Sequence, residues 1–312
     1  MLVSFKVGDK VSHVALVKMQ KMGSTATGGV FVRGSIQDNS GIMNFISFSQ
    51  DIADFFKENT VSVLQVAGTI QADRYSQDGA RQMMLEHVGL PPEEVDLSHL
   101  IPYTPRDIGE YQQKLQSLIE SVTKRHLSEL LREVFQGELF TRFSKNPAAM
   151  KHHHAYIGGL LEHSVDVAGM ARAMAAQCDG IDVDLVITGS LLHDIGKIKE
   201  ISPDIGFEYT DVGRFVGHLV LGAMMVEKAM AKVKDFPRQD AMELMHILLA
   251  HHGTVDKGSP VASSTRESLI VHYADEVNAV LSQFVQPDLG EKTEWQYNKM
   301  LGHQIFVRNN RS

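Results

Sequence analysis

Histidine and aspartate recur along the C-terminal two-thirds of this 312-residue chain, and the segments that lead to His163 and Asp194 are otherwise rich in small and apolar residues. His163 follows Gly-Gly-Leu-Leu-Glu, and His193-Asp194 follows Gly-Ser-Leu-Leu. Polar groups on such segments are costly to bury without partners, and metal coordination would offset that cost. A divalent cation needs several imidazoles and carboxylates converging on one point, which facing helices can supply. The series is His163, His193, Asp194, His218, His251, His252 and Asp275.

The chemistry that this series suits is phosphoester hydrolysis. A carboxylate such as Asp194 can bridge two ions, and two ions about 3.5–4 Å apart activate water and hold both oxygens of an in-line displacement. The single cysteine, Cys178, cannot form a thiolate cluster alone, so the predicted ligands are nitrogen and oxygen atoms. Such ligands suit manganese, iron and other divalent ions alike.

The N-terminal part of the chain has the pattern of short strands. Strand-like runs include 14–17, 29–36 and 61–68, with turn signals at 38–41 and 77–79. This pattern favours a small antiparallel barrel, and about ninety residues suit a five-stranded oligonucleotide/oligosaccharide-binding (OB) barrel. Composition leaves other small β-barrels open.

A proline-rich connection separates this region from a helical one. Two proline clusters and an acidic pair oppose both helix and sheet, and apolar residues recur at helical spacing beyond them. We therefore predict an α+β multidomain protein with an OB-like barrel at 1–90, a linker at 91–106 and an all-α domain at 107–312. The later helices are expected at about 157–177, 184–194, 211–233, 238–252 and 266–284.

Bulk composition narrows the partners. The net charge of −8 argues against a broad basic surface for duplex nucleic acid but leaves open a narrow channel for a single strand. No run approaches the roughly 18 apolar residues of a membrane helix, and the N-terminus lacks a signal-peptide pattern. We expect a cytoplasmic protein with no membrane partner.

Residues 191–197, Leu-Leu-His-Asp-Ile-Gly-Lys, resemble the central motif of the HD phosphohydrolase superfamily. His163 and Asp275 fall where the remaining core ligands of that superfamily belong, and the further histidines resemble its dinuclear branch. The resemblance implies two ions. One would be held by His163, His193, Asp194 and Asp275, and the other by Asp194, His218, His251 and His252.

A closer resemblance, to the YhaM family of bacterial 3′-5′ exoribonucleases, covers nearly the whole chain. That family joins an OB barrel to an HD domain. The resemblance implies a manganese-type dinuclear enzyme that releases 5′-mononucleotides from the 3′ end of single-stranded RNA, with single-stranded DNA as a further substrate. The matching stretches are 97–107 (LSHLIPYTPRD), 147–163 (PAAMKHHHAYIGGLLEH), 210–222 (TDVGRFVGHLVLG), 251–253 with 258–260, and 295–306 (WQYNKMLGHQIF).

Three further residues are catalytic candidates beside Asp194. The family places histidines next to the active site at His153 and His154, which could contact phosphate or transfer a proton; a polar lead-in to a helix is the alternative. Lys197, three residues after Asp194, would offset charge on the phosphoryl oxygens. A solvated lysine at a helix C-terminus is its alternative.

In the barrel, four aromatic residues are candidates for stacking single-stranded bases, with core packing the default for at least two of them. They are Phe31, Phe45, Phe48 and Tyr75. The barrel could orient substrate, recruit a partner or help subunits assemble into a homo-oligomer.

Two other functions remain open at this stage. One is an HD phosphohydrolase of small nucleotides or cyclic dinucleotides, and the other is a noncatalytic RNA-binding regulatory protein. The fused barrel favours a polymeric substrate, and no Gly-Tyr-Pro motif follows the HD motif. The complete ligand series weighs against a noncatalytic protein. The leading prediction is an exonuclease acting on single-stranded RNA.

Overall fold

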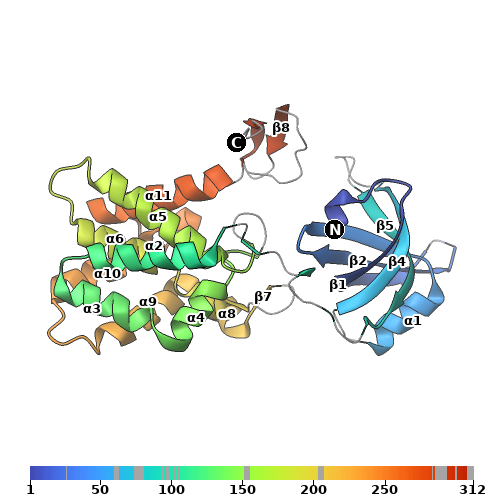
Figure 1. The fold of residues 1–312 in the computed structure, drawn as a ribbon, viewed down its shortest axis with the longest axis horizontal. Helices are drawn as coiled ribbons and strands as arrows, with labels where there is room; N and C mark the ends of the chain where they lie inside the picture. Colours follow the sequence, from blue (N-terminus) through green and yellow to red (C-terminus); the bar gives the residue numbers. More distant parts are fainter. Residues whose placement is uncertain are drawn as a thin grey trace. The chain divides into compact units, whose positions relative to one another are not determined.

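The computed structural model describes residues 1–25, 27–59, 63–73, 81–92, 95, 99–100, 103–104, 106–150, 155–202, 207–282, 284, 294–298 and 301–307. The chain divides into two compact units, Met1–Tyr103 and Thr104–Ser312 (Figure 1). Each unit has its own cluster of buried apolar side chains.

The N-terminal unit is a closed barrel with the strand order β1-β2-β3-β5-β4. Neighbouring strands are antiparallel except β3 and β5, which are parallel. This strand order, with a helix after the third strand, is the OB topology, so the predicted OB-like barrel is confirmed. The elements are a 3-10 turn at Leu2–Ser4, β1 (Lys10–Ser24), β2 (Val30–Asp38), β3 (Gly41–Ser47), α1 (Gln50–Glu58), β4 (Val63–Ala72) and β5 (Arg81–Gly89).

Alternation along the strands produces the barrel interior. In β4, every second residue from Leu64 to Ile70 is buried and the residues that alternate with them are partly exposed, as the period-two geometry of a strand requires. Gly68 lies at a register shift between β4 and β5, where a Cβ atom would be 2.1 Å from the carbonyl oxygen of Met84. Glycine at this position therefore lets the two strands approach closely enough to close the barrel.

A buried carboxylate ties the N-terminal turn to the barrel. Asp38, which is 1% exposed, accepts hydrogen bonds from the backbone of Leu2 (2.8 Å) and from the ring Nε2 of His13 (2.9 Å). It also accepts from the backbone N–H of Ser40 at 2.8 Å. Burial would raise the pKa of Asp38, but these hydrogen bonds outweigh it and lower the pKa to about 2.

The C-terminal unit is a helical bundle in which α5 packs against α6 and α11, and α9 against α10 (Figure 1). All eight residues from Leu185 to Leu192 in α6 are buried, so this helix forms the centre of the bundle. None of the helices that the structure describes is long and apolar enough to cross a membrane. The helices are α2 (Ile108–Ser121), α3 (Arg125–Val134), α4 (Gly137–Lys145), α5 (Gly159–Ala175), α6 (Val183–Leu192), α7 (Lys197–Glu200), α8 (Asp211–Val216), α9 (His218–Met230), α10 (Arg238–Ala250) and α11 (Arg266–Ser282), with a 3-10 turn at Val255–Lys257.

The structure differs from the sequence-based expectation in two places. The helix expected at 211–233 is two helices, α8 and α9, because Gly217 between them adopts a φ of 77° and turns the chain. The helical unit also contains two antiparallel strand pairs that the helical periodicity did not indicate. They are β6 (Ile201–Ser202) with β7 (Glu208–Tyr209), and β8 (Glu294–Asn298) with β9 (His303–Val307).

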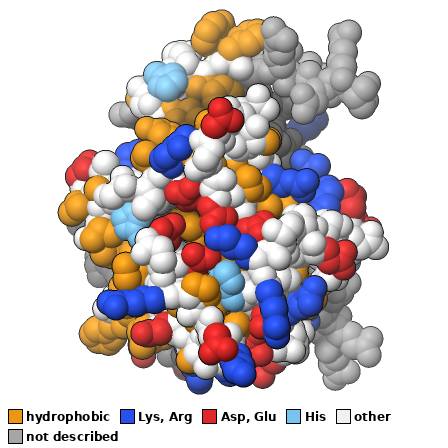
Figure 2. Space-filling model, turned by 90° about the vertical axis from the view of Figure 1, so that its left-hand side faces the viewer, with side chains coloured by type: hydrophobic (Ala, Val, Ile, Leu, Met, Phe, Trp, Pro, Cys, Tyr) orange, Lys and Arg blue, Asp and Glu red, His pale blue; other side chains and the backbone are white. Residues whose placement is uncertain are grey.

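One face of the molecule is shown in Figure 2. On this face the described Lys and Arg side chains are interspersed with Asp and Glu.

Candidate metal centre

All seven side chains of the His/Asp series lie in one cluster inside the helical unit. His163 lies on α5 and Asp275 on α11, whereas His193 and Asp194 follow α6 directly. His218 begins α9, and the pair at 251–252 follows α10. The cluster therefore gathers side chains from five separate parts of the bundle.

Glycine determines how closely these parts approach. Gly196 follows Asp194 by two residues, and a Cβ atom there would be only 2.0 Å from the carbonyl oxygen of His218. Any other residue would push the turn after α6 away from the start of α9. The glycine of the Leu-Leu-His-Asp-Ile-Gly-Lys motif thus has a packing reason: it lets Asp194 and His218 face each other.

The first group of donors surrounds one point. Nε2 of His163 lies 3.2 Å from Nε2 of His193 and 3.1 Å from Oδ1 of Asp275. Oδ2 of Asp194 lies 3.5 Å from His163 and 3.4 Å from His193, while His193 and Asp275 are 3.9 Å apart. Ligands bound at about 2.1 Å to one ion lie roughly 3.0–3.6 Å from their neighbours. The spacing of these four atoms therefore suits one cation.

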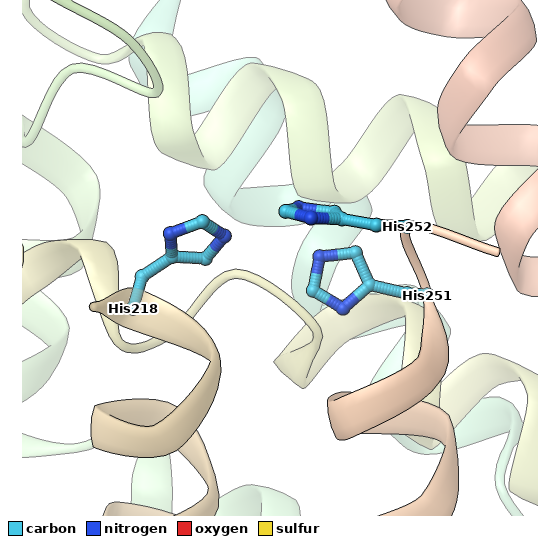
Figure 3. A group of neighbouring side chains, drawn as sticks. All are labelled: His218, His251 and His252. Atoms are coloured by element: carbon cyan, nitrogen blue, oxygen red, sulfur yellow. The ribbon is translucent and has the colours of Figure 1, made fainter. Parts of the chain in front are cut away.

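The second group is formed by three imidazoles, His218, His251 and His252, whose donor atoms lie within 4.8 Å of one another. Figure 3 shows the three rings converging from the start of α9 and the end of α10. Oδ1 of Asp194 lies 3.5 Å from Nε2 of His218 and 3.7 Å from Nε2 of His251. Asp194 thus directs one carboxylate oxygen toward each group, which is the geometry of a bridging ligand.

Four of the rings are held by hydrogen bonds on the side away from the cluster. Nδ1 of His193 donates to the Ser190 carbonyl at 2.7 Å, and Nδ1 of His251 donates to the Leu248 carbonyl at 2.9 Å. Nδ1 of His163 bonds Oδ1 of Asn278 at 2.8 Å, and Nδ1 of His218 bonds the Glu200 carboxylate at 3.0 Å. In a neutral imidazole a protonated Nδ1 leaves a lone pair on Nε2, which here faces the cluster.

Two buried atoms of the cluster test whether the residues fit a cation. Oδ1 of Asp194 and Nε2 of His218 find no hydrogen-bond partner among the described residues. A buried acceptor without a partner costs about 1–3 kcal/mol. A divalent cation would satisfy both atoms at once, and imidazole with carboxylate is a donor set that such ions accept. The residues therefore fit a divalent metal.

The electrostatics of the cluster agree with this fit. Burial would raise the pKa of Asp194, but Lys197 and His193 outweigh it and hold that pKa well below its usual range. The pKa of Asp275 is also lowered, because hydrogen bonding to His163 outweighs burial. Burial lowers the pKa of His251 to about 4, so this ring is neutral at pH 7, as a ligand must be.

His163 has the opposite shift. Burial would lower its pKa, but the two carboxylates that it contacts, Asp194 and Asp275, raise it to about 9. A proton on this ring therefore balances part of the negative charge of the cluster, which a cation would balance in its place.

Lys197 also lies at the cluster rather than in solvent. Its ammonium group forms an ion pair with Oδ2 of Asp194, and its side chain is 15% exposed. It begins α7 instead of ending a helix, so the sequence-based alternative of a solvated lysine at a helix C-terminus does not describe its position. Burial would lower its pKa, but Asp194 outweighs burial and raises it.

Sequence reasoning missed Glu200 and Asn278, the two side chains that bond the rings of His218 and His163. Both follow a singled-out residue by three positions in the same helix, Glu200 after Lys197 and Asn278 after Asp275. Residues three apart share a helix face, so this spacing was a usable signal.

The remaining predicted site residues have varied positions. Phe48 is 54% exposed, and the partly exposed ring of Phe31 has the Arg33 guanidinium 5.7 Å from its centre. Phe45 is 1% exposed and stacks on Phe56 inside the barrel. Its apolar ring is therefore committed to the core, and we correct its assignment as a base-stacking candidate. Tyr75, His153 and His154 lie outside the described residues.

The fold and the cluster together define a class of protein, an OB barrel followed by a helical domain with a His/Asp cluster that suits divalent cations. Residues 160–280 match the HD domain family model, and this range includes all seven residues of the cluster. The prediction that the chain carries an HD-superfamily domain is therefore confirmed.

Similarity to curated proteins extends over nearly the full length. The chain is 27% identical to the 3′-5′ exoribonuclease YhaM of Bacillus subtilis (strain 168), with 98% of this chain and 95% of that protein covered. The YhaM proteins of Bacillus velezensis and Bacillus licheniformis match with the same identity and coverage. The resemblance to the YhaM family is thus confirmed.

Solved structures with a likeness to the chain include a single-stranded DNA binding protein and an OB-fold domain. Rim1, a mitochondrial single-stranded DNA binding protein from S. cerevisiae, is 14% identical and covers 27% of this chain and 95% of its own, with a TM-score of 0.23. The second OB-fold domain of replication protein A from Methanococcus maripaludis is 15% identical and covers 31% of this chain and 97% of its own, with a TM-score of 0.24. The OB assignment itself rests on the strand order of the barrel.

Proposed function

We propose that this protein is a metal-dependent 3′-5′ exoribonuclease that releases 5′-mononucleotides from single-stranded RNA and uses two divalent cations. The observation that carries the proposal is the position of Asp194, which directs one oxygen toward each of two histidine groups. Two cations sharing a carboxylate are suited to in-line phosphodiester hydrolysis. The match over 98% of the chain to proteins named 3′-5′ exoribonucleases supports the choice of RNA.

Each protein group has a defined task in this proposal. The two groups on either side of Asp194 would hold one cation each, the first with His163, His193 and Asp275 and the second with three imidazoles. When bound, the cations would activate water and neutralise charge on the scissile phosphodiester.

Lys197 would act on the same phosphodiester from the protein side. Its ammonium group forms an ion pair with Oδ2 of Asp194, next to the first group of donors. From this position it can offset negative charge that develops on a phosphoryl oxygen. We retain His153 and His154 as proposed groups for phosphate contact or proton transfer. Manganese is the proposed ion, with iron as an alternative, because both accept imidazole and carboxylate ligands.

The barrel would supply contacts to the single strand away from the reacting phosphate. Phe31 and Arg33 are two residues apart on β2 and present an aromatic ring beside a guanidinium. Aromatic rings stack on bases of any sequence, and basic side chains follow the phosphate backbone, which together is how OB domains bind single strands. Phe48 offers a further exposed ring. Single-stranded DNA is a second substrate that the same contacts would accept.

The test follows degradation of a 5′-labelled single-stranded RNA with Mn²⁺. The wild-type protein should produce a descending ladder and free 5′-mononucleotides, and a circular RNA of the same sequence should resist. Asp194→Ala should leave the RNA intact. Asp166→Asn serves as the control, because Asp166 is a half-buried acid on α5 that bonds Tyr111 and is not one of the cluster's donors. Cleavage of the circular RNA would contradict exonuclease action. Hydrolysis restricted to small nucleotides would favour the alternative function, a phosphohydrolase of small nucleotides.

A further inference from the structure

The carboxylate of Glu200, next to the cluster, bonds both the main chain and the ring of His218. Glu200, the last residue of α7, accepts the backbone N–H of His218 at 3.0 Å on Oε1. The same carboxylate accepts from the ring Nδ1 of His218, at 3.1 Å on Oε1 and 3.0 Å on Oε2. A single side chain therefore determines both the main-chain position and the ring orientation of His218.

Contacts with Thr210 and Gly213 hold the backbone of Glu200 in place. Its carbonyl accepts the backbone N–H of Thr210 at 2.9 Å, and the hydroxyl of Thr210 donates to the Lys199 carbonyl at 2.6 Å. Gly213 lies directly on the Glu200 backbone, where a Cβ atom would be 2.5 Å from the carbonyl oxygen. The side chain of Glu200 is 11% exposed. The acceptor for His218 is thus preorganised by the packing of α7 against α8.

The other rings of the cluster whose Nδ1 contacts are described have neutral acceptors. His193 and His251 donate to backbone carbonyls, and His163 bonds a side-chain amide. A carboxylate acceptor makes an imidazole a stronger ligand than a neutral acceptor does, and it also selects the tautomer. The two groups around Asp194 therefore differ: one imidazole of the second group bonds a charged acceptor, whereas the imidazoles of the first group bond neutral ones.

We infer that Glu200 is a positioning residue that determines the affinity of the second cation through His218, and that the two cations of the centre consequently bind with separable affinities. This inference rests on the proposed two-cation function. Mutation of such an outer partner of a ligand typically weakens metal binding by roughly 10- to 100-fold. The effect of Glu200 falls on the group of His218, His251 and His252, while the group around His163 keeps its own acceptors.

The experiment titrates metal-free, full-length protein with Mn²⁺ alone and measures bound ions per chain. Wild-type protein should bind two ions. Glu200→Gln keeps an oxygen that can accept both hydrogen bonds but removes the charge, so it should weaken one ion by roughly 10- to 100-fold and leave the other unchanged. Glu267→Gln is the matched control. Glu267 is a partly exposed acid on α11 that accepts the backbone N–H of Asp182, and it is not part of the cluster.

A double-mutant cycle separates positioning from a merely structural role. If Glu200 acts through His218, Glu200→Gln should cause no additional loss of Mn²⁺ binding in a His218→Ala background. Additive losses, equal weakening of both ions, or wild-type binding by Glu200→Gln would each overturn the inference. These outcomes leave the proposed function standing, because wild-type protein still binds two ions. Wild-type protein that binds fewer than two ions would refute the two-cation function together with this inference.

Discussion

Replacing Asp194 and Lys197 separately should distinguish a bridging ligand from a charge-stabilising side chain. The two residues form an ion pair, but only Asp194 directs an oxygen toward each of the two groups of donors. Lys197→Ala removes one charge-stabilising group, which typically lowers kcat about 10²–10³-fold, or about 3–4 kcal/mol. Asp194→Ala withdraws a ligand from both groups, so two contributions of this size are lost and kcat should fall by about 10⁴–10⁶-fold.

The assay is Mn²⁺-dependent release of mononucleotides from single-stranded RNA, with bound metal measured on the same samples. Lys197→Ala should retain its metal, because Lys197 offers no ligand to a cation, whereas Asp194→Ala should lose metal along with activity. Lys199→Ala is the control, since that lysine is exposed two residues further along the chain. Equal residual activity of the two variants, with metal still bound to both, would refute the bridging role of Asp194.

Three further predictions concern the barrel. The pKa of Asp38 is lowered from 3.8 to about 2, so its ionised form stabilises the folded barrel by about 2 kcal/mol. This stabilisation is present above pH 3.8 and is lost as the pH falls through about 2. Hydrogen exchange of barrel amides should show the loss in the wild-type protein, and Asp38→Asn should abolish this pH dependence. Phe45→Ala should destabilise the barrel by about 3–5 kcal/mol in denaturant unfolding, because the ring is buried. Phe48→Ala should change the stability by less than about 0.5 kcal/mol, because that ring is exposed. Equal effects of the two substitutions would contradict the buried position of Phe45 and the exposed position of Phe48. Phe31→Ala should raise the KM for RNA by an amount equivalent to about 1–3 kcal/mol of lost base stacking, with hydrolysis of a small phosphodiester unchanged; an equal change for both substrates would deny Phe31 a role in binding RNA.

The sequence by itself was enough to predict the two kinds of fold and to single out the cluster. Alternation in the first ninety or so residues and helical spacing after the prolines are local patterns, so they predict strands and helices without tertiary contacts. The seven His and Asp residues stood out as a series spread over separate predicted helices, and His163 and Asp194 also emerge from small and apolar segments, where a polar group needs a partner. The sequence shows that Gly196 follows the His-Asp pair, but it does not show that this glycine packs against the carbonyl of His218.

Only the tertiary structure decided how those residues meet. Which oxygen of Asp194 faces which histidine group depends on distances between helices that are remote in sequence. The acceptor behind His218 is Glu200, eighteen positions away, and the order of residues alone does not show that these two side chains meet. Phe45 lies on β3 and is buried, whereas Phe48 follows the end of that strand and is exposed; closure of the barrel decides that the face of β3 with Phe45 points inward.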